Sequence, residues 1–476
     1  MAKKVSFFKE SNNFTVFGSI PAFPIGVNYE AYRWCFRGCA YCFACINKKK
    51  IFALSVGGLG SPSELIKSTV SAIEKADKNP NPNSFLDWYL RNRYPIYASN
   101  NSDIFVPGCE GISRQILEIL DRYGFPFFFT TKGIHTKELF NTLTQMSTPR
   151  AGLITITSLS DKYRKKYEPE SLSPKERFEL VAKLNEAGIP TGINVVPFLH
   201  SQFPTLKEIE KLLIKAKEVR AKEVTFGALN FRGGTLKIIP EDFKFLELSP
   251  PASKYYYVNR KGVYANFPKL AELFNEIERI AKELGIRVSF QWELNTLIKA
   301  ENYSLEDERN YVVTYQNLMD TFSPKIVPTI QMILNELRKK KESEIFLFTL
   351  SEFIETAKEL CNQIAFPYSQ KFKDIHSSFQ IDRAFSKALK SMSYLEMLRY
   401  GWHKEAGHNL FEDYTVWKVK DKEGNILIDE NGDPFAVFLP SIELIKAKTN
   451  PKDGITGGIL STDFLKNFGI EFEVEG

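Results

Sequence analysis

Hydrophobic and polar positions follow a regular pattern over the first three fifths of the chain. Between about residue 29 and residue 292, short β-branched and aromatic runs alternate with stretches whose apolar positions have helical spacing. This alternation predicts repeated βα units around a parallel sheet. The expected strands are 29–33, 94–99, 126–131, 152–157, 191–196, 223–229 and 287–291, and the expected helices are 62–76, 113–123, 136–146, 174–187, 206–219 and 268–284.

An α/β fold of this kind closes naturally into a full or partial parallel barrel. Ser173 and Pro174 form an N-cap and a first helical residue, and Gly188 follows the end of the same helix, so this βα unit has well-marked boundaries. In a parallel barrel the active site gathers at the carboxyl ends of the strands. Functional residues are therefore expected just after each strand.

The alternation stops near residue 300, which predicts a barrel core over 1–299 and an appended α+β region over 300–476. We interpret the appended region as a candidate for substrate recognition. The turns at 422–425 and 430–433 favour hairpins. The acidic turn at 429–433 lacks the full pattern of a calcium-binding loop and is interpreted as a plain turn. The expected elements are helices at 324–341 and 350–364 and a β-meander at 414–419, 426–428 and 435–439.

Composition narrows the class of protein only slightly. Hydrophobic residues make up 43% and charged residues 25% of the 476 positions, which is ordinary for a globular protein. The net charge of +6 permits nucleic acid as a partner without requiring it. The amino terminus lacks a signal-peptide pattern, and the apolar runs are far shorter than the roughly 20 residues that span a bilayer, so no membrane association is expected.

Cysteine is distributed unevenly along the chain. Four of the six cysteines are Cys35, Cys39, Cys42 and Cys45, whereas Cys109 and Cys361 stand alone. This distribution is unlike a disulfide framework and typical of a metal site in a reducing compartment. We therefore expect a cytoplasmic protein.

The spacing CxxxCxxC places three thiols on one tight loop, just after the first expected strand. Cysteine thiolates are the usual ligands of iron–sulfur clusters, so Cys35, Cys39 and Cys42 are expected to hold a [4Fe–4S] cluster through three irons. The fourth iron then stays open for a substrate or cofactor, and Tyr41 is placed to cover the cluster. The alternatives are a zinc site with Cys45 as a fourth ligand and simple buried packing cysteines.

This motif, at the start of a βα barrel, resembles the radical SAM superfamily, and within it the spore photoproduct lyase family. The likeness covers roughly the first three fifths of the chain and implies a partial (β/α)6-type barrel. It is carried, beyond the cysteines, by Ser99-Asn100-Asn101-Ser102-Asp103-Ile104, by Phe129-Thr130-Thr131-Lys132, by Thr155-Ile156-Thr157 with Glu168-Pro169, and by Ala187-Gly188-Ile189-Pro190 with Asn194-Val195-Val196-Pro197.

The resemblance implies an activity and its partners. The open iron would bind S-adenosylmethionine (SAM), whose reductive cleavage gives a 5′-deoxyadenosyl radical that abstracts hydrogen from the substrate. An electron donor such as flavodoxin or ferredoxin is expected. The analogy favours a nucleic-acid base or nucleotide as substrate. A peptide or small metabolite is the first alternative, and a cluster-binding protein without turnover is the second.

The resemblance also implies roles for single residues. Lys132 is similar to a family lysine that meets the SAM carboxylate, Ser102 to a serine near SAM, and Thr155 or Thr157 to another SAM contact. Asp103 is expected to hold the ribose hydroxyls or the ammonium of SAM. The alternatives are a solvated lysine, an exposed carboxylate and threonines that only pack within the sheet.

Further candidate residues concern the substrate. Arg232 is expected to face the barrel mouth and Tyr256 to line the substrate side, against the alternatives of a surface arginine and simple packing. The family carries a hydrogen-returning cysteine where this chain has Asn100, so Cys109 is the candidate that replaces it. The alternative for Cys109 is a small buried apolar residue.

Overall fold

The computed structural model describes residues 13–16, 23–32, 35, 37–42, 61–98, 102–198, 206–228, 231–232, 256–259, 262–265, 267–290, 316–343, 346–375, 392–403, 416–438, 455–456, 459–467 and 469–471. Their largest feature is an eight-stranded sheet in which one edge strand is antiparallel and all other pairs are parallel. The α/β fold predicted from the sequence is confirmed. In sheet order the strands are β1 (Phe14–Val16), β2 (Val27–Tyr29), β3 (Ile96–Ala98), β4 (Phe127–Thr131), β5 (Arg150–Thr155), β6 (Thr191–Phe198), β7 (Val224–Ala228) and β11 (Val288–Phe290).

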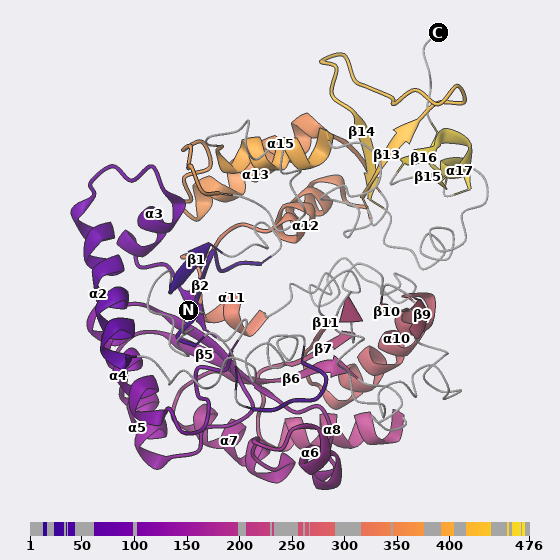
Figure 1. The fold of residues 1–476 in the computed structure, drawn as a ribbon. Coiled ribbons are helices and arrows are strands. Elements are labelled where there is room, and N and C mark those ends of the chain that lie inside the picture. The colour runs from indigo at the N-terminus through magenta and orange to yellow at the C-terminus, as the bar shows by residue number, and fades with distance from the viewer. Residues whose placement is uncertain are drawn as a thin grey trace.

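Helices cover the outer side of this sheet, between successive parallel strands (Figure 1). All six helices expected in the barrel are present, with the largest shift at the start of α4. That helix begins at Glu110 rather than 113, because the N–H of Ser113 already donates to the carbonyl of Cys109. These helices are α2 (Pro62–Lys78), α4 (Glu110–Arg122), α5 (Lys137–Gln145), α7 (Pro174–Glu186), α8 (Leu206–Glu218) and α10 (Phe267–Leu284).

Two short helices were not expected from the sequence, α3 (Phe85–Arg91) and α6 (Asp161–Tyr167). Each is only seven residues long, too short for apolar periodicity to stand out. Their N-caps are ordinary, since Ser84 accepts from the N–H of Asp87 and Ser160 from the N–H of Tyr163. In the sequence, only the capping serines Ser84 and Ser160 indicated that these two helices begin there.

The parallel strands are buried on both faces, as their nearly continuous apolar sequences require. Phe127, Phe128 and Phe129 of β4 are all fully buried. Gly152 lies opposite Phe129 in the register of β4 and β5, and a Cβ at Gly152 would lie 2.4 Å from the Phe129 ring. The close approach of these two strands therefore requires glycine at that position.

The carboxyl-terminal third forms a second unit of helices and a five-stranded sheet, ordered β12-β14-β13-β16-β15. The expected pairing of two meander strands is confirmed by β13 and β14, but 426–428 makes only isolated bridges. The turns before and after that segment are closed by backbone bonds to Asp421 and Asp429, which leaves it too short for a strand. The elements are β12 (Phe346–Thr349), β13 (Val416–Lys420), β14 (Phe435–Phe438), β15 (Ile455–Thr456), β16 (Ile459–Ser461) and α17 (Thr462–Lys466).

Besides α17, the described helices of this unit are α11 (Gln316–Phe322), α12 (Ile330–Lys341), α13 (Leu350–Gln363) and α15 (Tyr394–His403). The expected helix at 324–341 begins later, at Ile330, because Pro324 and Pro328 interrupt the first part and Thr329 supplies the N-cap. The expected helix at 350–364 is confirmed by α13.

This unit packs against the amino ends of the barrel strands. Asn317 donates to the carbonyl of Pro190, just before β6, and the N–H of Val327 donates to Pro24, just before β2. Asp374 accepts from the N–H groups of Phe85 and Leu86 at the start of α3. These contacts lie at the end of the sheet opposite the carboxyl ends of the strands.

None of the helices in the described part of the chain combines the length and the apolar character needed to cross a lipid bilayer.

We expect Asp374→Ala to lower the free energy of unfolding by about 1–3 kcal/mol, because it removes a charged acceptor from the N-terminal N–H groups of α3. Urea unfolding measures the change. Asp463→Ala is the control, since Asp463 is exposed and its ion pair with Lys466 lies at the surface; its effect should stay within about 0.5 kcal/mol. Equal effects in the two variants would contradict the inferred role of Asp374.

Candidate functional site

The cysteine loop follows β2 at the carboxyl end of the sheet. Cys39 is buried, and Cys35 and Cys42 are partly buried. The loop turns tightly, because Gly38 adopts a left-handed conformation with φ of 69° and the N–H of Cys42 donates to the carbonyl of Cys39 at 3.2 Å. The three cysteines of the predicted motif therefore lie on one short loop.

The described residues contain no group of three or more Cys, His, Asp or Glu side chains that could hold a metal ion. Burial raises the pKa of the Cys39 thiol to about 12, and it also raises the pKa of Cys35. Cysteine ligates a metal or cluster as the thiolate, so ligation here would release protons from these thiols. Cys45 lies outside the described residues.

Lys132 comes directly after β4 and reaches the cysteine loop. Its Nζ atom lies 5.6 Å from the centre of the Tyr41 ring, within cation–π range. Burial by itself lowers the pKa of Lys132, but Coulombic interactions with the neighbouring Cys39 and Glu168 groups outweigh this effect and raise it. Lys132 is therefore a firmly held cation beside the thiols.

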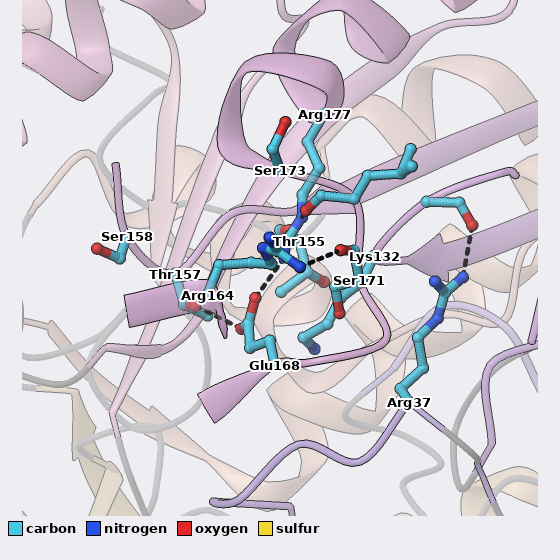
Figure 2. A network of polar contacts seen from close by, with 12 residues as sticks. Arg37, Lys132, Thr155, Thr157, Ser158, Arg164, Glu168, Ser171, Ser173 and Arg177 are labelled. Carbon is cyan, nitrogen blue, oxygen red and sulfur yellow. Dashed lines mark hydrogen bonds and ion pairs between the residues drawn. The ribbon is translucent and has the colours of Figure 1, made fainter. Parts of the chain in front are cut away.

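The carboxylate of Glu168 forms the centre of a buried polar network (Figure 2). Its Oε2 atom lies 2.5 Å from Nη2 of Arg177, and both side chains are only 1% exposed. Its Oε1 atom accepts hydrogen bonds from Thr157 at 2.6 Å and from the hydroxyl of Tyr41. Burial raises the pKa of Glu168, but Arg177 and Lys132, with the hydroxyl donors, bring it below its ordinary value.

The segment after α6 fastens the cysteine loop to this network. The N–H of Ala40 donates to the carbonyl of Tyr167 at 2.9 Å, and the N–H of Leu172 donates to the carbonyl of Lys132 at 3.3 Å. Arg177 of α7 donates to the carbonyls of Thr155 and Leu172. Loop, strand ends and helix are thereby joined into one arrangement.

Two further predicted residues have partners on neighbouring segments. Ser102 donates to the buried carboxylate of Glu30, directly after β2, at 3.0 Å. Asp103 pairs with Arg37 of the cysteine loop at 2.7 Å and accepts from Thr131 at 2.8 Å. In this structure Asp103 therefore contacts the loop arginine.

A row of polar side chains runs across four neighbouring strands. Thr155 of β5 lies opposite Asn194 of β6, Asn194 opposite Thr225 of β7, and Thr225 opposite Ser289 of β11. All four are buried. Asn194 donates to Thr155 at 3.3 Å, and the hydroxyls of Thr225 and Ser289 are 2.8 Å apart. Among the residues that the structure describes, nothing donates to the buried Oδ1 atom of Asn194.

This row faces the inside of the barrel. Phe226 and Phe290, next to Thr225 and Ser289, contact Phe274 of α10 on the outer side, with ring centres 6.4 and 4.5 Å away. Because successive strand residues point to opposite faces, Thr225 and Ser289 point inward. Inward positions of parallel barrels are usually filled by branched apolar residues. The polar row therefore gives this part of the interior hydrogen-bonding groups in place of the usual apolar packing.

The structure thus brings Tyr41, Lys132, Thr157 and Glu168 into one network, with Thr155 beside it. Cys109 lies elsewhere, at the N-cap of α4 within the hydrophobic core, where burial raises the pKa of its thiol to about 11. Arg232 lies on β8 (Phe231–Arg232) and Tyr256 on β9 (Tyr256–Asn259), which join β10 (Gly262–Ala265) in a small sheet. The side chains of Arg232 and Tyr256 lie outside the described residues.

Sequence reasoning missed the buried charges and amides that complete the site: Glu30, Arg37, Glu168, Arg177 and Asn194. Glu168 and Asn194 stood in motifs that carried the family resemblance, and Arg37 stood inside the cysteine motif itself. The sequence therefore drew attention to these three positions, but it did not indicate which distant residues each of them contacts.

Comparisons with known proteins return distant relatives. No family model matches the chain. A curated relative, the uncharacterized protein ORF301 of Acidianus two-tailed virus, is 22% identical over 213 residues, which are 43% of this chain and 67% of that protein.

Two kinds of solved structure are similar to the chain. A variant of spore photoproduct lyase with a dinucleoside spore photoproduct matches 58% of this chain and 79% of its own, with 15% identity and a TM-score of 0.40. SuiB of Streptococcus suis bound to S-adenosylmethionine matches 55% of this chain and 49% of its own, with 12% identity and a TM-score of 0.36. Both are radical SAM enzymes, which is the resemblance that the sequence predicted. Similarity this distant assigns neither activity nor residue roles to this chain.

We expect Glu168→Gln to lower the free energy of unfolding by about 3–5 kcal/mol at pH 7, because it leaves the buried Arg177 without its counter-ion. Chemical denaturation measures the change. Glu176→Gln is the matched control: Glu176 completes the exposed capping box of α7, so its loss should cost only about 0.5–1 kcal/mol.

The pH dependence checks the same interaction. A carboxyl group whose pKa is lowered by folding stabilises the fold above its unfolded pKa, and this contribution is lost as pH falls through the folded pKa. The difference between the wild type and Glu168→Gln should therefore shrink as pH falls below about 4.5. A difference that is constant with pH would contradict an ionised Glu168.

Proposed function

We propose that the protein is a radical SAM enzyme in which Cys35, Cys39 and Cys42 hold one [4Fe–4S] cluster. The observation that carries this proposal is the position of the three cysteines on one loop at the carboxyl end of the first barrel strand, beside Lys132 and the buried Glu168. This end of a parallel barrel is where such enzymes place their chemistry.

The chemistry of the donor set fits the cluster. Three thiols on one loop can ligate three irons and leave the fourth open. The donor set therefore suits a cluster with one open iron. A structural zinc site needs four ligands, and a zinc site with Cys45 as the fourth stays the alternative.

The surrounding residues fit SAM. Its carboxylate matches the ammonium of Lys132, and its hydroxyl and amino donors match the Oδ1 atom of Asn194, which has no donor in the described part of the chain. When bound, the cluster and SAM supply a reductive cleavage to methionine and a 5′-deoxyadenosyl radical, which takes a hydrogen atom from the substrate.

The chain itself contributes orientation and exclusion of water. Lys132 would bind the SAM carboxylate, and the nearby Glu168 would favour the charged form of Lys132. Tyr41 covers the loop with its ring and is fixed there through its hydroxyl bond to Glu168. Thr155 and Asn194 would orient the nucleoside part of SAM from the inner face of β5 and β6. The electron is expected from a donor such as flavodoxin or ferredoxin.

A polar substrate suits the interior better than a hydrocarbon, because Thr225 and Ser289 continue the polar row beyond Thr155 and Asn194. A nucleic-acid base or nucleotide is the substrate class we propose. A peptide or small metabolite is the alternative, and both classes carry the amide or amino donors that such a row can bind.

Cys109 is retained as the proposed hydrogen-atom donor to the product radical, in the place of the cysteine that the family carries at Asn100. Its raised pKa, about 11, keeps the thiol protonated, and an S–H bond is what hydrogen return requires.

Anaerobically reconstituted protein, reduced with dithionite in the presence of SAM, should form 5′-deoxyadenosine, measured by chromatography. Cys39→Ala should form none, because it removes a cluster ligand. Cys361→Ala is the matched control, since Cys361 is also buried but lies on α13, within the appended unit. A wild-type protein that holds the cluster without forming 5′-deoxyadenosine would support the non-catalytic alternative.

Binding to a short single-stranded oligonucleotide tests the substrate class. If phosphates are bound, the dissociation constant should rise steeply between 50 and 200 mM salt, by about tenfold or more, because binding releases counter-ions. Fluorescence anisotropy measures it. Absence of saturable binding at low salt would favour the peptide or small-metabolite alternative.

A further inference from the structure

Arg37 is buried inside the cysteine loop, between Cys35 and Cys39. Its side chain is only 2% exposed. A guanidinium group in such a position needs acceptors for all its N–H groups and a compensating negative charge. Both requirements are met by residues from outside the loop.

The acceptors come from the ends of two neighbouring strands. Beyond β3, Asp103 accepts from Nε at 2.7 Å and the carbonyl of Phe105 accepts from Nη2 at 2.8 Å. At the end of β4, Thr131 accepts from Nη2 at 3.3 Å, and just beyond it the carbonyl of Gly133 accepts from the same nitrogen. One side chain thus ties the loop to both strand ends.

Two more contacts complete the set around Nη1. It lies 2.6 Å from Nε2 of His135 and 3.0 Å from the carbonyl of Glu170, in the segment after α6. The N–H of Glu170 donates in turn to the carbonyl of Arg37 at 3.4 Å. The loop is therefore held by contacts that involve no cluster.

Lysine cannot reproduce this arrangement. Its ammonium is a single point with three donors, whereas the planar guanidinium carries five donors directed at acceptors on several segments. Charge alone at this position would therefore not restore the contacts of Arg37.

We propose that Arg37 is the positioning residue that forms the cysteine loop in advance, holding it against the ends of β3 and β4 before a cluster is bound. The cluster as ligand rests on the proposed function, but the formation of the loop can be tested in the iron-free protein. If Arg37 acts in this way, its loss exposes the loop thiols selectively while the barrel stays folded.

The test is alkylation of iron-free protein by N-ethylmaleimide, with the modified cysteines quantified by mass spectrometry. Cys39 reports on the loop, and Cys361, fully buried on α13, reports on global unfolding. In Arg37→Lys the rate at Cys39 should rise at least about tenfold relative to Cys361, because the reaction follows the population of the locally opened loop. An unchanged ratio in folded protein overturns the proposal.

Arg150→Lys is the matched control. Arg150 also donates to backbone carbonyls, of Thr144 and Thr148, but at the amino end of β5. It should leave the ratio of Cys39 to Cys361 unchanged. An equal rise in both arginine variants would mean that any lost arginine loosens the loop, and the proposal would fail.

A milder variant covers the case in which Arg37→Lys unfolds and both thiols react together. His135→Ala removes one exposed acceptor and leaves the Asp103 pair intact, so it should raise the ratio by about two- to fivefold. No rise in this variant, with Arg37→Lys unfolded, contradicts the proposal.

The electron paramagnetic resonance spectrum separates positioning from stability. In reconstituted and reduced Arg37→Lys, the change in the spectrum on adding SAM should be smaller than in the wild type, because the cysteines would hold a cluster less precisely relative to Lys132. A full wild-type change overturns the positioning role. Wild-type protein that takes up no cluster defeats the proposed function, while the alkylation ratio still decides the role of Arg37.

Discussion

The buried carboxylate of Glu168 is the group on which the carboxyl end of the sheet depends. Removing an ionised carboxylate from water costs several kcal/mol, and only good partners offset that cost. Here the partners are Arg177, Lys132, Thr157 and Tyr41. They come from α7, from the end of β4, from the end of β5 and from the cysteine loop, so the carboxylate is stable only when four segments are in place together.

This dependence extends to the thiols. Tyr41 lies between Cys39 and Cys42 in sequence, so its bond to Glu168 fixes the second half of the cysteine loop. Arg37 fixes the first half through Asp103. The loop is thus anchored on both sides of Cys39 by buried polar contacts, and its position is a property of the barrel.

The two ends of the barrel differ in chemistry. At the amino end, the carboxyl-terminal unit packs against the sheet through α11 and through contacts of Asp374 and Val327. At the carboxyl end, buried charges and a polar inner row surround the cysteine loop. The described contacts of the carboxyl-terminal unit are therefore remote from the proposed chemistry, and its role in substrate recognition stays a prediction.

The sequence by itself determined the order of the barrel elements and the position of the cysteine motif, because periodicity, capping and thiol spacing are local properties of the chain. It also marked Lys132, which follows a strand end. It was wrong about the first expected strand, 29–33, because β2 ends at Tyr29. It was also wrong about the start of α12 and the strand at 426–428, where prolines and tight turns limit the length of the element. Only the tertiary structure decided that Asp103 pairs with Arg37, that Glu168 pairs with Arg177, and that Asn194 faces the interior. The stability of a buried charge depends on which distant segments surround it, and local sequence does not contain that information.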